Sequence, residues 1–153
     1  MAEYDELKIS INKLGKEYIA ELSKQLINAD KVASGKLLKS LKYEVIEVLG
    51  NIMIRVKGES YLEEVDKGRK PGKEPKVSAI RKWIDVRSIK PWRGQSKDSL
   101  AVVISRSIGR KGIKPTNVIK KSIDNVMRNK KELLGKAALK DVEKQIKNIL
   151  TNI

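Results

Sequence analysis

The fold is decided by residues 41–56, LKYEVIEVLGNIMIRV. Apolar residues alternate with polar ones on both sides of the pair Gly50-Asn51, and such alternation is typical of half-buried strands. A Gly-Asn pair suits a two-residue turn whose first residue has a positive φ. Val48 and Leu49 break the alternation beside Ile46, so the first strand is expected to carry a bulge or to be covered on both faces. This stretch therefore predicts a β-hairpin with one buried face.

Helical spacing dominates the chain on both sides of the hairpin. Apolar residues recur every three or four positions from Tyr4 to Asn28, which predicts a helix there. A short helical turn is expected within Ala29–Lys39, and one or two further turns from Tyr61 to Val65, ended by Gly68.

Three more helical segments are predicted beyond the loop that follows Gly68. The first begins at Val77, has ended by Pro91 and places Trp83 in the core. The second is capped by Asp98 or Ser99 and stops at Gly109 or Gly112. Its expected buried stripe is Leu100, Val103, Ile104 and Ile108. The last runs from Pro115 nearly to the chain end, with a break around Asn129–Gly135.

Together these segments predict an α+β fold in a single domain over residues 1–153. An N-terminal helix and further helices pack on a small antiparallel sheet built around the hairpin, and a long C-terminal helix follows. The core is expected to be aliphatic, because the chain has two Trp, four Tyr and no Phe.

The chain contains no Cys and no His. It therefore lacks disulfides, thiolate metal sites and the commonest general base and metal ligand. We expect a protein that is not an enzyme and that has no catalytic residue, cofactor or metal. The N-terminal residues do not form a secretion signal, and no apolar run is long enough to span a bilayer. We therefore expect a soluble protein that is made in a cytoplasm and has no membrane contact.

Positive charge is the strongest compositional signal. The chain has 34 Lys and Arg against 19 Asp and Glu, a formal net charge of +15. Lys67–Arg93 contains ten of these cations against Glu74 and Asp85, and Arg110–Lys131 contains eight against Asp124. Such clusters suit a surface that faces nucleic acid or an acidic partner, and a lysine-rich surface that only keeps the protein soluble is the alternative.

Two glycine motifs have both a functional and a structural interpretation. Gly68–Lys73 resembles a phosphate-binding loop, but three residues instead of four separate its glycines and Glu74 follows the Lys. A structural turn with a basic tip is the favoured interpretation. Gly109–Gly112 has the G-x-x-G spacing of an RNA-binding KH module, and an ordinary helix stop is the alternative.

Carboxylates and an aromatic residue are further candidates. Glu63, Glu64 and Asp66 could hold the metal of a nuclease, although a solvated helix face explains them more simply. Trp92 lies in the loop Lys90–Arg93, where it could stack on a base or fill a pocket in a neighbouring subunit. We favour the subunit contact, because aromatic and Arg anchors are enriched at interfaces.

The run from Tyr61 to Pro75, followed by Val77, Ala79, Ile80 and Trp83, resembles tailed-bacteriophage neck and tail-completion proteins, which include minor tail, virion morphogenesis and head-tail joining proteins. That family has a comparable aromatic-led turn, a Gly-Arg-x-Pro-Gly loop and a Pro followed by an Ile-x-x-Trp helix. Further matches are Ser34–Leu37 with Ser40-Leu41, and Ala101–Lys114, which ends before Pro115. The resemblance covers about residues 34–123, so residues 124–153 are expected to form a C-terminal helical extension.

The resemblance implies a small α+β fold with a helix laid on an antiparallel sheet. It also implies a virion structural protein, assembled in the bacterial host cytoplasm as a homo-oligomeric ring of six or twelve subunits. The ring would join or seal the head-tail connector and the tail, with portal or connector and tail tube proteins as partners and with non-specific contact to genome DNA. The expected subunit-interface or DNA-channel residues are Arg69, Lys70, Lys73, Trp92, Arg93, Arg110 and Lys111. The alternative function is a cytoplasmic basic nucleic-acid-binding protein with a KH-like loop.

Overall fold

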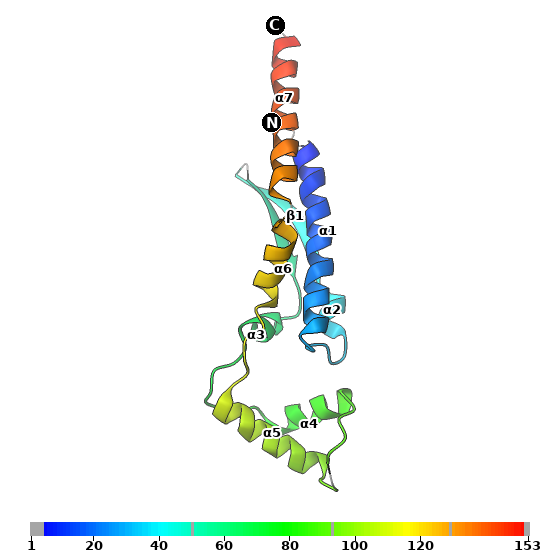
Figure 1. The fold of residues 1–153 in the computed structure, drawn as a ribbon, viewed down its shortest axis with the longest axis vertical. Helices are drawn as coiled ribbons and strands as arrows, with labels where there is room; N and C mark the ends of the chain where they lie inside the picture. Colours follow the sequence, from blue (N-terminus) through cyan, green and yellow to red (C-terminus); the bar gives the residue numbers. More distant parts are fainter. Residues whose placement is uncertain (1–4, 50, 93, 129, 152–153) are drawn as a thin grey trace. The chain divides into compact units, whose positions relative to one another are not determined.

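The computed structural model describes residues 5–49, 51–92, 94–128 and 130–151. The elements are the helices α1 (Asp5–Asn28) and α2 (Lys36–Ser40), the strands β1 (Lys42–Val48) and β2 (Asn51–Lys57), and the helices α3 (Leu62–Lys67), α4 (Val77–Val86), α5 (Lys97–Lys111), α6 (Val118–Met127) and α7 (Lys131–Thr151) (Figure 1). The predicted α+β class, with a hairpin, an N-terminal helix and a long C-terminal helix, is confirmed. In the part of the chain that is described, no helix is both long and apolar enough to cross a membrane.

The chain divides into two compact units. Unit 1 comprises the described parts of residues 1–26, 41–58 and 118–153, and unit 2 comprises those of 27–40 and 59–117. Each unit is assembled from segments that are far apart in the sequence. The predicted boundary between a core and a C-terminal extension, at residue 124, falls inside α6 and within unit 1.

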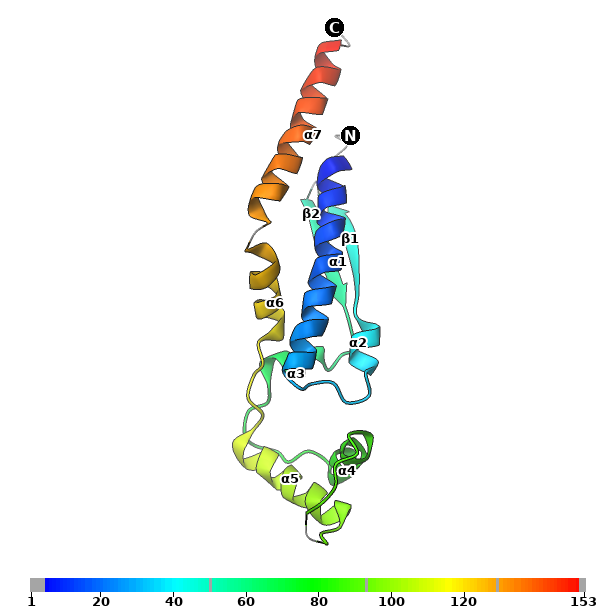
Figure 2. The ribbon, with the colours of Figure 1, turned by 45° about the vertical axis from the view of Figure 1, so that its right-hand side comes forward.

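Unit 1 is built on α1, which runs alongside the hairpin and alongside α6 and α7 (Figure 2). The Tyr43 hydroxyl of β1 donates to the Asn12 side-chain oxygen at 2.7 Å, and Lys8 pairs with Glu47 at 3.1 Å. Gly15 is buried on the same face of α1, and a Cβ there would overlap the Tyr43 ring. The missing side chain therefore lets the strand lie close against the helix.

The hairpin is regular over its whole length. The antiparallel register runs unbroken from the pair Lys42–Lys57 to the pair Val48–Asn51, so the bulge considered for the first strand is absent. The turn lies one residue earlier than predicted, because Asn51 pairs with Val48 and already belongs to β2. Leu49 therefore occupies the first turn position with a φ of 51°, and Gly50 lies outside the described residues.

A carboxylate from α7 caps the first turn of α1. Asp141 is fully buried and accepts hydrogen bonds from the backbone N–H groups of Glu6 at 3.1 Å and Leu7 at 2.9 Å. Backbone amides in the first turn of a helix have no hydrogen-bond partner within the helix. A negative charge at this end is also attracted to the positive end of the helix dipole. Lys144 pairs with Asp5 at 3.0 Å and reinforces the contact. The C-terminal helix is thus bound to the N-terminal one by charge.

Helix α6 ends at Met127 and α7 begins at Lys131, so the break between them is earlier than the predicted Asn129–Gly135. Asn129 lies outside the described residues, whereas Gly135 is inside α7. Two polar contacts hold this region to α1: Lys130 pairs with Glu17 at 3.0 Å, and Asn125 donates to Glu21 at 2.8 Å.

In unit 2, α5 buries small residues instead of the predicted large ones. Its buried positions are Ala101, Ser105 and Gly109, four residues apart. The predicted stripe is therefore wrong in part: Val103 is 53% exposed, and Leu100, Ile104 and Ile108 are half-buried. The physical reason is that residues 72–75 lie directly on this face, where the Ser105 hydroxyl donates to the Pro75 carbonyl at 2.7 Å.

Two smaller expectations for unit 2 are also wrong. The N-cap of α5 is Ser96, whose side chain accepts the Ser99 N–H at 3.1 Å, so the helix begins before the predicted Asp98 or Ser99. The fully buried residue of α4 is Ile84, whereas Trp83 is 39% exposed. The Trp83 ring is covered on one side by the Arg87 guanidinium, 5.9 Å from its centroid, instead of by a core.

Replacing Gly15 with Ala should lower the free energy of unfolding by about 1 to 3 kcal/mol, because the new methyl group would overlap the Tyr43 ring. Gly135→Ala is the matched control, since nothing lies near that position in α7. It should stabilise the protein by up to about 1 kcal/mol, the usual helix preference of Ala over Gly. Urea unfolding followed by circular dichroism measures both. Equal stabilisation by both changes would contradict the close packing of β1 on α1.

Asp141→Ala should destabilise the protein by about 1 to 2 kcal/mol, the usual cost of losing a helix cap. Glu143→Ala, at an exposed position on the same helix, should change the free energy of unfolding very little. Thermal and urea unfolding of the two variants provide the comparison. If the two substitutions cost the same, the Asp141 carboxylate does not cap α1.

Candidate basic interface

Two loops of unit 2 pair through their backbones. The Arg69 N–H donates to the Ile113 carbonyl at 2.9 Å, and the Ile113 N–H donates back to the Arg69 carbonyl at 2.7 Å. The Gly72 N–H donates to the Gly109 carbonyl at 2.8 Å. Residues 68–75 and 109–115 are called the paired loops from here on, although the second segment begins with the last three residues of α5.

Glycines make this pairing possible. Gly68 and Gly112 both have a φ of 69°, in the left-handed region that favours Gly. A Cβ on Gly68 would overlap the Ile113 carbonyl, and one on Gly112 would overlap the Arg69 carbonyl. Gly109 lies against Glu74 in the same way, with 2.6 Å between an ideal Cβ and the Glu74 Cγ. The glycines that resemble ligand-binding motifs in the sequence therefore serve the contact between the two loops.

The end of α3 joins the same arrangement. The N–H groups of Thr116 and Asn117 donate to the Asp66 carbonyl at 2.9 and 3.1 Å, and the Thr116 hydroxyl donates to the Val65 carbonyl at 2.8 Å. Carbonyls in the last turn of a helix lack partners within it, so these bonds satisfy them. These bonds hold residues 116–117, which follow the second loop, against the end of α3, which precedes the first loop.

The pairing gathers five of the predicted interface residues. Arg69, Lys70, Lys73, Arg110 and Lys111 are all exposed on the paired loops. The Arg69 guanidinium also donates to the Lys73 carbonyl at 2.5 Å, which holds its own loop closed. Lys114 is exposed on the second loop and joins the group, although the sequence analysis did not single it out.

The other two predicted residues lie elsewhere. Trp92 is 76% exposed in the loop between α4 and α5, whereas Arg110 and Lys111 are in the last turn of α5. The 15 residues of α5 span roughly 22 Å at 1.5 Å per residue, so Trp92 and the paired loops lie at opposite ends of that helix. Arg93 lies outside the described residues.

Most acidic residues of unit 2 are paired with cations outside the paired loops. The ion pairs are Asp30–Arg87, Glu59–Lys36, Glu63–Lys67, Asp98–Arg81 and Asp85 with both Arg81 and Lys97. The hydrogen bond from Lys97 lowers the pKa of Asp85 below its ordinary value, with Arg81 adding to the effect. A hydrogen bond from Lys67 likewise lowers the pKa of Glu63. These ion pairs therefore neutralise cations away from the paired loops.

The cations of the paired loops are not neutralised in this way. Among the residues that the structure describes, none of the six takes part in an ion pair. Unit 2 as a whole carries 18 Lys and Arg against 8 Asp and Glu, a formal charge of +10. Six of these cations lie where the two loops meet, beside the single carboxylate of Glu74, and give the paired loops a formal charge of +5.

The geometry gives little support to the two alternative functions. Gly109 is inside α5, and the Gly112 N–H donates to the Ile108 carbonyl at 2.8 Å, so G-x-x-G is the last turn of a helix and its stop, unlike the open loop of a KH module. Glu63 is bound to Lys67, and within the described residues no group of three His, Cys, Asp or Glu side chains could hold a metal.

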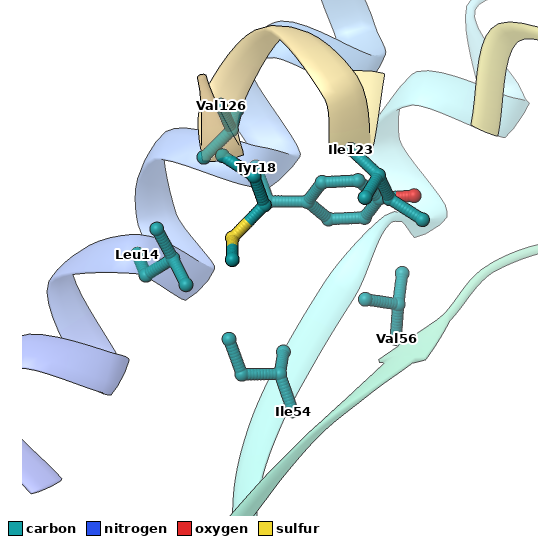
Figure 3. Close-up of a pocket in the computed structure, with 7 residues that line it drawn as sticks. Leu14, Tyr18, Ile54, Val56, Ile123 and Val126 are labelled. Carbon is teal, nitrogen blue, oxygen red and sulfur yellow. The ribbon is translucent and has the colours of Figure 1, made fainter. Parts of the chain in front are cut away.

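Two apolar pockets were not anticipated from the sequence. In unit 1, side chains of α1, β2 and α6 converge on a pocket of about 250 Å³ (Figure 3). Its lining residues are Leu14, Tyr18, Ile54, Val56, Ile123, Val126 and Met127. In unit 2, a pocket of about 520 Å³ is bordered by Tyr61, Trp83 and Arg87. No local signal could have revealed either pocket, because each combines residues from distant segments.

The paired loops are the strongest candidate site on this chain, because they combine a defined backbone geometry with unneutralised charge. Comparisons with protein-family models, curated proteins and solved structures found no match to this chain. Its function is therefore inferred from its own residues and their arrangement.

Gly68→Ala should lower the free energy of unfolding more than Gly35→Ala does. Both glycines have a positive φ, 69° and 73°, so an added side chain is strained at either position. Only at Gly68 would the new methyl group also collide with the opposite loop, at a further cost of about 1 to 3 kcal/mol. Urea unfolding of both variants measures the difference, and equal losses would mean that the loops are not closely paired.

Proposed function

We propose that this chain is a bacteriophage virion structural protein of the neck or tail-completion region. Copies of it form an oligomeric ring that joins or seals the head-tail connector and the tail. The main supporting observation is that two of the segments that carry the resemblance, 61–75 and 101–114, contact each other in the paired loops. The two segments thus form one structural element in this chain, which supports the view that the resemblance concerns architecture.

Exposed apolar side chains give independent support for assembly. On α7, Leu139, Val142 and Ile146 follow each other at spacings of three and four, so they lie on one helix face, and all three are exposed. Trp92 adds a large exposed aromatic group to unit 2. Exposed apolar surface of this kind commonly marks contacts between proteins.

A ring requires two different complementary patches on each subunit. The chain offers two surfaces of different chemistry, the apolar face of α7 in unit 1 and the loop carrying Trp92 in unit 2. In this proposal the helix face and the Trp92 loop make subunit contacts, and none of the named residues performs chemistry.

Light scattering of the purified chain, alone and with connector and tail proteins, should give a mass of six or twelve subunits. The double variant Val142→Glu with Ile146→Glu should shift this mass to smaller species, because it places charge on the apolar face of α7. Lys136→Gln with Lys140→Gln is the matched control, since it changes the net charge by the same amount at exposed positions of that helix.

Mass analysis of purified virions provides the decisive count. The proposal expects this chain in the particle at a copy number that is a multiple of six. It is wrong if the chain stays monomeric under all these conditions and is missing from virions.

A further inference from the structure

We propose that the paired loops bind the phosphate backbone of duplex DNA without reading its sequence. Only the source of that duplex, the phage genome, rests on the proposed function. The binding itself follows from the charge and the geometry of unit 2.

The first argument is the charge available for an anion. Arg69, Lys70 and Lys73 come from one loop, and Arg110, Lys111 and Lys114 come from the other. All six side chains are exposed, and none is engaged by a carboxylate within the described residues. Duplex DNA carries one negative charge per roughly 1.7 Å of its axis, and each phosphate neutralised by such a cation releases condensed counterions.

The second argument is that the backbone holds these cations together before any ligand arrives. The hydrogen bonds that join Arg69 to Ile113 and Gly72 to Gly109 place the two basic segments side by side. Arg106 is exposed one helical turn before Arg110 and extends the same basic surface along α5. A prearranged surface loses less conformational entropy on binding than six independent side chains on mobile segments would.

The third argument separates duplex from single-stranded nucleic acid. Proteins that bind single strands combine basic grooves with aromatic side chains on which the bases stack. The paired loops contain no aromatic residue, and Trp92 lies at the opposite end of α5. Contacts to phosphates alone suit a duplex, whose bases are already stacked on each other.

The fourth argument separates nucleic acid from an acidic protein. The cores of protein interfaces are enriched in aromatic residues and depleted of Lys. The paired loops have four Lys, two Arg and one Glu, Glu74, but only one large aliphatic side chain, Ile113. This composition resembles a phosphate-binding surface more than the core of a protein interface.

The test is fluorescence anisotropy of the full chain with a mixed-sequence duplex, measured at several salt concentrations between about 50 and 200 mM. The loop variant combines Lys70→Gln, Lys73→Gln, Arg110→Gln and Lys111→Gln. The control variant combines Lys13→Gln, Lys16→Gln, Lys120→Gln and Lys121→Gln, which are exposed positions in unit 1 with the same total charge change. Circular dichroism checks that both variants keep the fold.

The loop variant should bind the duplex at least about tenfold more weakly than the native chain. Its salt dependence should also become shallower, by about one unit of slope for each phosphate that the variant no longer binds. The control variant should keep most of the affinity, because it changes only the long-range field. Equal losses in the two variants would overturn the inference, since the positions of the cations would then not matter.

Two further outcomes would also overturn it. One is tighter binding to single-stranded RNA of the same length than to the duplex. The other is unchanged duplex binding by a loop variant that no longer associates with connector or tail proteins, which would assign the surface to an acidic protein partner.

Failure of the proposed function has a different signature. If the chain is absent from virions but binds duplex DNA through the paired loops, the proposed ring is wrong and the DNA-binding proposal stands. If the ring forms but the chain shows no salt-dependent DNA binding, only the DNA-binding proposal is wrong.

Discussion

The reciprocal hydrogen bonds between Arg69 and Ile113 are the constraint on which unit 2 depends. They join the end of α3 to the end of α5, and glycines at 68 and 112 are required because a side chain at either position would collide with the opposite backbone. Residues 72–75 then lie on the small-residue face of α5, which explains why Ser105 and Gly109 are buried there while Val103 is exposed. One backbone contact thereby determines which face of α5 is covered.

The same constraint organises the charge of unit 2. Acidic side chains are engaged by cations on or near α2, α3, α4 and the start of α5. The paired loops hold six basic side chains that take part in no ion pair within the described residues, beside the one carboxylate of Glu74, so they form a basic surface. Because exposed charge attracts anions over about one Debye length, this surface is suited to a polyanion. The two proposed roles therefore use different surfaces, the apolar face of α7 for assembly and the basic paired loops for DNA contact.

Unit 1 relies on contacts between the two ends of the chain. Asp141 caps the first turn of α1, and Lys144 adds a second charge contact. Gly15 admits the Tyr43 ring against α1, which gives the two-stranded sheet a helix to pack on. A lone hairpin is marginally stable in water, so this packing is what allows β1 and β2 to persist.

The sequence by itself determined the hairpin, the helices and the α+β class, because alternation and helical spacing reflect preferences of neighbouring residues. It also named the basic residues of the candidate site, since clusters of Lys and Arg are visible in local composition. The tertiary structure alone decided that Arg69 and Lys70 stand beside Arg110 and Lys111, that Trp83 is exposed and that Asp141 caps α1. Those facts depend on which distant segments meet, and a local pattern contains no information about the segment that will cover it.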